Sequence, residues 1–197
     1  MNSFETLITE KGISRYSERW HPHNVDSFKS LVCQGCLKDI DRNVLSNIAY
    51  SLQYIQYLQL QIDELNLHSI VQCSLYKTYI ITSMSIVEAV FNQALRCSGL
   101  WPQTDGWELI KQTKTNEFTD KGDTYRIENN IMIKNTPVEK KMDFNNLINR
   151  IKEKGVLNLR SSNFPEIKKL QKLRNRVHLQ IAENRMDTDY YKFGKTM

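Results

Sequence analysis

The apolar residues recur at helical spacing along two long stretches of the chain. The segment "DIDRNVLSNIAYSLQYIQYLQLQIDELNL" (residues 39–67) predicts a helix of more than five turns, with Asp39 or Asp41 as its N-cap. A second helix is predicted from about residue 69 to residue 97, ending at Gly99. Its middle is apolar nearly all round, which indicates the central helix of a bundle. The link between the two helices is short, so we expect them to pack antiparallel.

Helical patterns also precede and follow this pair. Residues 3–20 are weakly helical, and residues 25–40 predict a short helix interrupted near Gly35. The segment "MDFNNLINRIKEKG" (residues 142–155) predicts a helix capped by Asp143 and ended by Gly155. A last helix is expected with Asn163 as its N-cap, a proline in its first turn and an apolar stripe formed by Ile167, Leu170, Leu173, Val177 and Ile181.

Between residues 107 and 142 the pattern changes to alternation. In "TYRIENNIMIKN" (residues 124–135), Tyr125 and Ile127 lie opposite Ile131 and Ile133 if Asn129-Asn130 forms a two-residue turn. The segment is too short to form its own core, so we interpret it as a β-hairpin insertion. The predicted fold is mostly α, an antiparallel helical bundle in a single domain over residues 1–197, with this insertion at about 107–142.

Charge is distributed unevenly along the chain. The net charge is +5 over 197 residues, but residues 134–176 contain twelve Lys/Arg and four Asp/Glu. A basic segment on a neutral to acidic body favours a polyanionic partner, of which nucleic acid is the commonest. The alternative is a solvated helix face.

Two features bear on the cellular location. The N-terminal twenty residues have no apolar segment of the kind found in secretory signals. The segment "TYIITSMSIVEAVFNQAL" (residues 78–95) approaches the length of a membrane span, but its polar residues and Glu88 favour a buried helix. We therefore expect a cytoplasmic protein that does not enter the membrane.

The four cysteines leave two interpretations. Cys33 and Cys36 form a C-x-x-C pair downstream of His21 and His23, which raises the possibility of zinc. The pair is not repeated and the histidine spacing fits no known finger. Free thiols in a reducing compartment are the favoured interpretation, and we expect no metal or other cofactor.

Arg174 and His178 lie one turn apart on the last predicted helix. At 100° per residue they fall about 40° and about 80° from the centre of the apolar stripe, on one margin of it. Lys172 and Arg176 lie toward the opposite face. Three explanations remain open: a partly buried structural histidine, an arginine that pairs with Glu88, or part of an active site. Glu88 is the only charge between Lys77 and Arg96, so a buried carboxylate there needs a cationic partner.

The segment "LRNRVHLQ" near the end of this helical chain resembles the Arg-Asn…His signature of the HEPN superfamily. "SIVEAVFNQAL" (residues 85–95) is similar to the second long helix of such proteins, where a polar residue often faces the site. The resemblance covers residues 41–181 in layout and is specific across residues 174–178. It implies a HEPN-like bundle, and members of the superfamily occur in toxin–antitoxin systems, phage defence and RNA processing.

The resemblance, taken with the chemistry of RNA, implies metal-independent cleavage. RNA carries its own nucleophile, so an enzyme needs only proton transfer by His178 and charge stabilisation by Arg174. Asn175, Arg176 and Lys172 would contact the substrate, and Glu88 would hold Arg174. A homodimer would supply a second Arg–His pair, and an antitoxin or defence protein is a possible partner.

Two alternatives to the enzyme stay open. Only three residues separate Arg174 from His178, fewer than in the usual motif, which favours a non-catalytic module that binds RNA, a nucleotide or a partner protein. The other alternative is a structural bundle in which removal of Arg174 costs several kcal/mol. The tail aromatics Tyr190, Tyr191 and Phe193 either pack beside the last helix or stack on bases.

Overall fold

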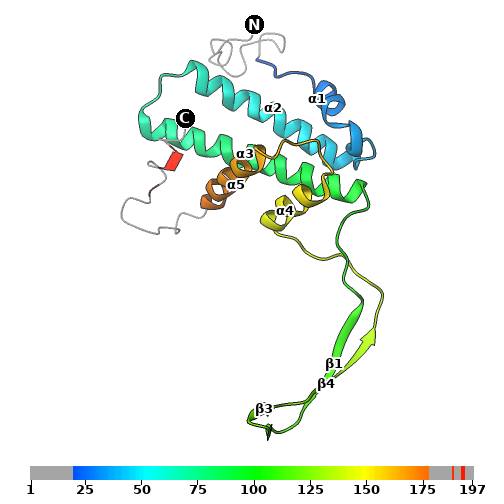
Figure 1. Cartoon of the computed structure of the whole chain (residues 1–197). Coiled ribbons are helices and arrows are strands. Elements are labelled where there is room, and N and C mark those ends of the chain that lie inside the picture. Colours follow the sequence, from blue (N-terminus) through cyan, green and yellow to red (C-terminus); the bar gives the residue numbers. More distant parts are fainter. Residues whose placement is uncertain (1–19, 178–187, 189–191, 194–197) are drawn as a thin grey trace. The chain divides into compact units, whose positions relative to one another are not determined.

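Two long antiparallel helices form the centre of the helical part (Figure 1). They are α2 (Arg42–Glu64) and α3 (Ser69–Cys97), and four residues link them. Asp41 is the N-cap of α2: its Oδ1 accepts the backbone N–H groups of Asn43 and Val44 at 2.9 and 3.0 Å. Both predicted helices and their antiparallel packing are confirmed: α3 has the predicted bounds, and α2 ends three residues before the end of its predicted segment.

The computed structural model describes residues 20–177, 188 and 192–193. The chain divides into a helical unit (Met1–Gly99 and Asp143–Met197) and a β unit (Leu100–Met142). The weakly helical segment expected at residues 3–20 therefore lies outside the described residues, apart from Trp20. None of the helices in the described part has both the length and the apolar character that a membrane span requires.

Three shorter α-helices and a 3-10 helix pack around α2 and α3. Helix α1 (Val25–Val32) lies against α2, and the 3-10 helix η3 (Gly35–Leu37) lies against α3, so the predicted interruption near Gly35 is present. Helices α4 (Phe144–Lys154) and α5 (Asn163–Arg174) both pack on α3 and on each other. Helix α3 is thus the central helix. The buried apolar core of the unit includes Ile48, Leu58, Met84, Phe91, Leu95, Leu147, Ile148, Ile151 and Phe164.

Helix α4 begins and ends where its sequence signals predicted. The Asp143 side chain accepts the N–H of Asn146 at 2.7 Å, and Gly155 ends the helix with φ +60°. The start of α5 differs slightly, because Asn163 is its first residue and Ser162 the N-cap. Phe193 is fully buried, as expected if the tail packs on the protein, whereas Tyr190 and Tyr191 lie outside the described residues.

The β unit contains two short antiparallel ribbons. Strand β1 (Trp107–Lys114) pairs with β4 (Glu128–Lys134), and β2 (Phe118–Asp120) pairs with β3 (Asp123–Tyr125). Gly106 precedes β1 at φ +77°, and a Cβ there would lie 2.5 Å from the carbonyl oxygen of Asn135. Close backbone approach at the start of the ribbon therefore requires glycine.

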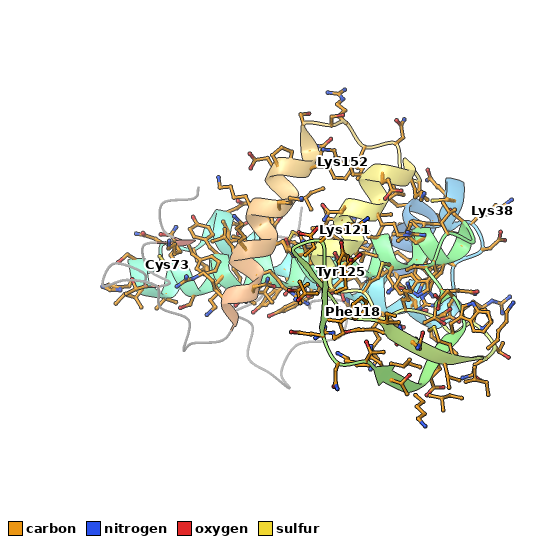
Figure 2. All side chains as sticks on the ribbon, turned by 60° about the horizontal axis from the view of Figure 1, so that its bottom comes forward. Lys38, Cys73, Phe118, Lys121, Tyr125 and Lys152 are labelled. Carbon is orange, nitrogen blue, oxygen red and sulfur yellow. The ribbon has the colours of Figure 1, made fainter. Side chains whose placement is uncertain are left out.

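The prediction of a turn at Asn129-Asn130 was wrong. Both residues lie inside β4, opposite Thr113 and Gln112 of β1. The tight turn is at Lys121-Gly122, where φ is +49° and +92°. Two successive positive φ values are what a two-residue turn between right-twisted strands demands. Gly122 adopts its value without strain, whereas Lys121 carries a Cβ in the left-handed region. Phe118 and Tyr125 stack beside this turn with ring centroids 5.8 Å apart (Figure 2).

Candidate functional site

Helix α5 places Arg174 at its last turn. Phe164 anchors the start of the helix in the core, and Gln171 is buried one turn before Arg174. The N–H of Asn175 then contacts the carbonyl groups of both Gln171 and Leu173, and the chain tightens into the 3-10 helix η4 (Asn175–Val177). The α-helix thus ends at Arg174.

This end differs from the sequence prediction of a helix that continues to Ile181. In a 3-10 helix each residue advances by about 120°, so the 100° projection does not apply beyond Arg174. Asn has a low helix propensity because its side chain competes for nearby polar groups. In the structure, Oδ1 of Asn175 lies 3.4 Å from Nη1 of Arg174. His178, the predicted proton carrier, lies outside the described residues, as does Ile181.

An ion pair connects α5 to the middle of α3. Nη2 of Arg174 donates to Oε2 of Glu88 at 2.6 Å, so the expected contact between these two residues is present. The two side chains are 31% and 33% exposed. Glu88 is therefore not the fully buried carboxylate that the sequence suggested. For a pair of this exposure we expect a contribution of about 1 kcal/mol, less than the several kcal/mol expected for a fully buried pair.

The Arg174 guanidinium also lies over an aromatic ring. Its Cζ is 5.9 Å from the ring centroid of Phe144, the first residue of α4, which is 4% exposed. A cation over a buried ring gains about 0.5–2 kcal/mol from the ring quadrupole. Arg174 thus joins α3, α4 and α5, and its Nη1 donates to Oδ1 of Asn175. Sequence reasoning missed Phe144, although its place at the head of the stripe Leu147, Ile148 and Ile151 marks it as a core residue.

The predicted substrate-contacting residues differ in exposure. Lys172 and Asn175 are exposed, and Asn175 contacts Arg174. Arg176 is half-buried with a buried Nε atom, in contrast to the solvent-facing position expected for it. The structure therefore brings Arg174, Asn175 and Glu88 together, and it places Lys172 on the outer surface of α5.

Helices α4 and α5 and their connection carry an excess of basic residues. Residues 143–176, all in the helical unit, contain nine Lys/Arg and three Asp/Glu. The exposed cations on these helices and their connection are Lys152, Lys154, Arg160, Lys169 and Lys172. Lys154 pairs with Glu153 at 2.9 Å, and Lys152 lies over the ring of Phe164. The α4–α5 part of the helical unit therefore has the charge that a polyanion requires, although Lys152 and Phe164 lie at the end of these helices opposite to Arg174 and Phe144.

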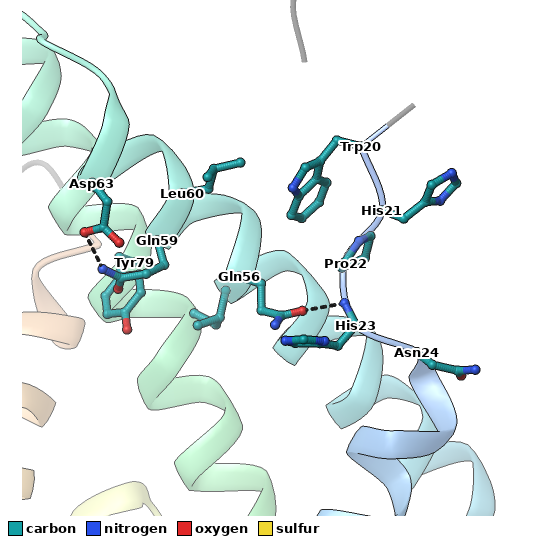
Figure 3. A pocket seen from close by; sticks show the side chains of 11 residues that line it. Trp20, His21, Pro22, His23, Asn24, Gln56, Gln59, Leu60, Asp63 and Tyr79 are labelled. Atoms are coloured by element: carbon teal, nitrogen blue, oxygen red, sulfur yellow. Dashed lines mark hydrogen bonds between the residues drawn. The ribbon is translucent and has the colours of Figure 1, made fainter. Parts of the chain in front are cut away.

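A separate cavity of about 770 Å³ lies against α2 (Figure 3). Trp20, His21 and His23 come from the segment before α1, while Gln56 and Asp63 come from α2. Oε1 of Gln56 accepts the backbone N–H of His23 at 2.9 Å, which holds that segment on the helix. This cavity was not predicted, and the tryptophan and two histidines next to Pro22 are the signal that marks it.

The cysteines are thiols in the structure. Cys33 Sγ lies 3.3 Å from the carbonyl oxygen of Lys38. Burial, and then the neighbouring Cys36 and Asp39, raise the pKa of the Cys97 thiol. Among the described residues, no three His, Cys, Asp or Glu side chains are grouped so that they could hold a metal ion.

Comparison of the chain with known protein families, with curated proteins and with solved structures gave no match. The candidate site therefore rests on its own geometry and on the sequence signature around Arg174.

Proposed function

We propose that the chain is a metal-independent endoribonuclease of HEPN type, acting as a toxin or phage-defence component. The supporting observation is that Arg174 sits at the end of α5, held by Glu88 and Phe144, four residues ahead of His178. A guanidinium fixed in this way is suited to binding a phosphate, and α4 and α5 carry an excess of basic residues. RNA is the expected substrate.

In the proposed reaction the 2′-OH of RNA attacks the adjacent phosphate. The oxygen–phosphorus bond to the 2′-oxygen forms, and the bond to the 5′-oxygen breaks. One histidine removes the 2′-OH proton and another protonates the leaving 5′-oxygen, so the products are a 2′,3′-cyclic phosphate and a 5′-OH. Two copies of His178 in a homodimer would supply both groups, while Arg174 stabilises the charge on the phosphorane.

A non-catalytic module that binds RNA, a nucleotide or a partner protein, such as an antitoxin, is the second candidate. Nη2 of Arg174 is already engaged by Glu88, which leaves less of the guanidinium for a transition state. The three-residue gap between Arg174 and His178 points the same way. In this case Lys172 and Asn175, the exposed neighbours of Arg174, would carry the binding.

An RNA-cleavage assay in EDTA distinguishes the two. Wild type is compared with His178→Ala, and His21→Ala serves as the matched control because His21 lines the separate cavity on α2. We expect cyclic phosphate ends from wild type and His21→Ala, an intact DNA analogue, and a loss of about 10²–10⁴-fold in His178→Ala. Equal cleavage by His178→Ala contradicts the mechanism. No cleavage, with RNA binding that weakens in Lys172→Ala, favours the binding module.

A further inference from the structure

Exposed apolar side chains are concentrated on the β unit. Among the described residues, ten of the sixteen exposed large hydrophobic side chains lie between Leu100 and Met142. Every residue of β1 and β4 is exposed. A two-stranded ribbon alone is marginally stable in water, and at least three strands are needed for independent stability. An apolar surface of this kind marks an interaction site.

The two edges of this ribbon differ. Strand β1 carries an irregularity at Ile110, between the paired residues Leu109 and Lys111, and it carries two lysines. Bulges and lysines are the devices that block an edge strand from pairing with another chain. Strand β4 has no such irregularity, because its residues pair in a continuous register. It also has no charged residue between Glu128 and Lys134. The free edge of β4 is therefore the one open to a further strand.

The sequence of β4, "ENNIMIK", is complementary to itself in the antiparallel sense. If Ile131 faces Ile131 of a second copy, Glu128 faces Lys134 at each end of the strand. Met132 and Ile133 then face Asn130 and Asn129. A shift of the register by one residue places Glu128 opposite either Ile133 or Asn135. Lys134 then no longer faces a carboxylate of the second copy. One register therefore pairs both charges.

Glu128 keeps its charge in this arrangement. The hydrogen bond from Lys114, and then the charges of Lys114 and Arg126, lower the pKa of the Glu128 carboxyl. At neutral pH it is ionised and carries a negative charge at the end of β4.

We propose that β4 pairs antiparallel with β4 of a second copy of the chain, with Ile131 on the two-fold axis. The product is a four-stranded sheet in the order β1-β4-β4-β1, which meets the number of strands that a stable sheet needs. The proposal concerns the β unit alone and does not depend on ribonuclease activity. One strand pair falls short of the roughly 1,000 Å² of a stable interface, so we expect self-association in the micromolar range.

Sedimentation velocity of the full chain over a range of concentrations tests the interface. Ile131→Lys places two like charges opposite each other at the axis, whereas Ile110→Lys adds the same charge on the irregular β1 edge. We expect at least a tenfold weaker dimer for Ile131→Lys and an unchanged dimer for Ile110→Lys. A monomer for wild type up to about 100 μM, or an equal dissociation constant for wild type and Ile131→Lys, overturns the proposal.

Cross-linking tests the register without relying on a destabilising change. Directly opposed residues of an antiparallel pair have Cβ atoms about 5 Å apart, so Ile131→Cys should form a disulfide with itself across the axis when a mild oxidant such as diamide accepts the two electrons. Mass spectrometry should find the 131–131 peptide in Ile131→Cys and no 110–110 peptide in Ile110→Cys. Equal cross-linking at both positions, or none at 131, contradicts the register. A dimer that survives both tests without this contact would instead use the helical unit.

Discussion

The helical unit and the β unit differ in where they keep their apolar side chains. In the helical unit, α3 is covered by α2, α4 and α5, and Leu95 and Ile148 are fully buried. In the β unit, strands of comparable apolar content leave Ile131 and Ile133 about half exposed. A helix can bury a stripe against neighbours from its own chain, whereas a two-stranded ribbon has two open faces and two open edges. The helical unit thus buries its apolar side chains within itself, whereas the β unit leaves them exposed.

The largest test of this difference replaces one isoleucine in each unit. Ile148→Ala leaves a cavity in a closed core and should lower the free energy of unfolding by about 2–5 kcal/mol. Ile133→Ala removes a side chain that is 46% exposed and should lower it by less than about 0.5 kcal/mol. Urea unfolding followed by circular dichroism measures both. Similar losses for the two variants would show that the ribbon side chain is as well packed as the core.

A smaller effect is expected for the polar contact between α3 and α5. A double-mutant cycle on Arg174→Ala and Glu88→Ala should give a coupling free energy of about 1 kcal/mol, because the pair is a third exposed. The surface pair Lys154–Glu153 at the end of α4 is the control and should give no measurable coupling, because both side chains are exposed. Coupling of 3 kcal/mol or more between Arg174 and Glu88 would mean a buried pair and a structural role.

The smallest effect concerns the turn of the β unit. Lys121→Gly relieves a positive φ and should stabilise the β2–β3 hairpin by about 0.5 kcal/mol. Asn130→Gly should weaken the β1–β4 pairing by a similar amount, since Asn130 is a strand residue. Amide hydrogen exchange measured by NMR reports both. Slower amide exchange in Asn130→Gly than in wild type would instead support a turn at Asn129-Asn130.

The parts that sequence predicted well are those with local signals. Asp41, Asp143 and Gly155 define helix ends because capping uses neighbouring backbone groups, and apolar spacing defines the faces that pack. The turn was misplaced because Asn129-Asn130 has stronger turn propensity than Lys121-Gly122. Cross-strand pairing with Gln112 and Thr113 overrides that propensity.

The candidate site was predicted only in part for a related reason. Glu88, a lone charge on an apolar helix, signals that it needs a cation, and Arg174 was an available one. The ring of Phe144 beneath Arg174 results from the meeting of the first residue of α4 with the last of α5. No spacing within one helix reports such a contact. The 3-10 turn at Asn175–Val177 was not predicted, because Val177 and Ile181 continue the helical spacing of apolar residues in the sequence.

The irregularity at Ile110 sets a limit on assembly. An edge-to-edge contact that leaves both outer edges open can repeat, and repetition leads to fibres. Here the outer edges of any β4-paired sheet are β1 strands, each interrupted at Ile110 and lined by Lys111 and Lys114. Growth through the β4 edge would therefore stop after one addition.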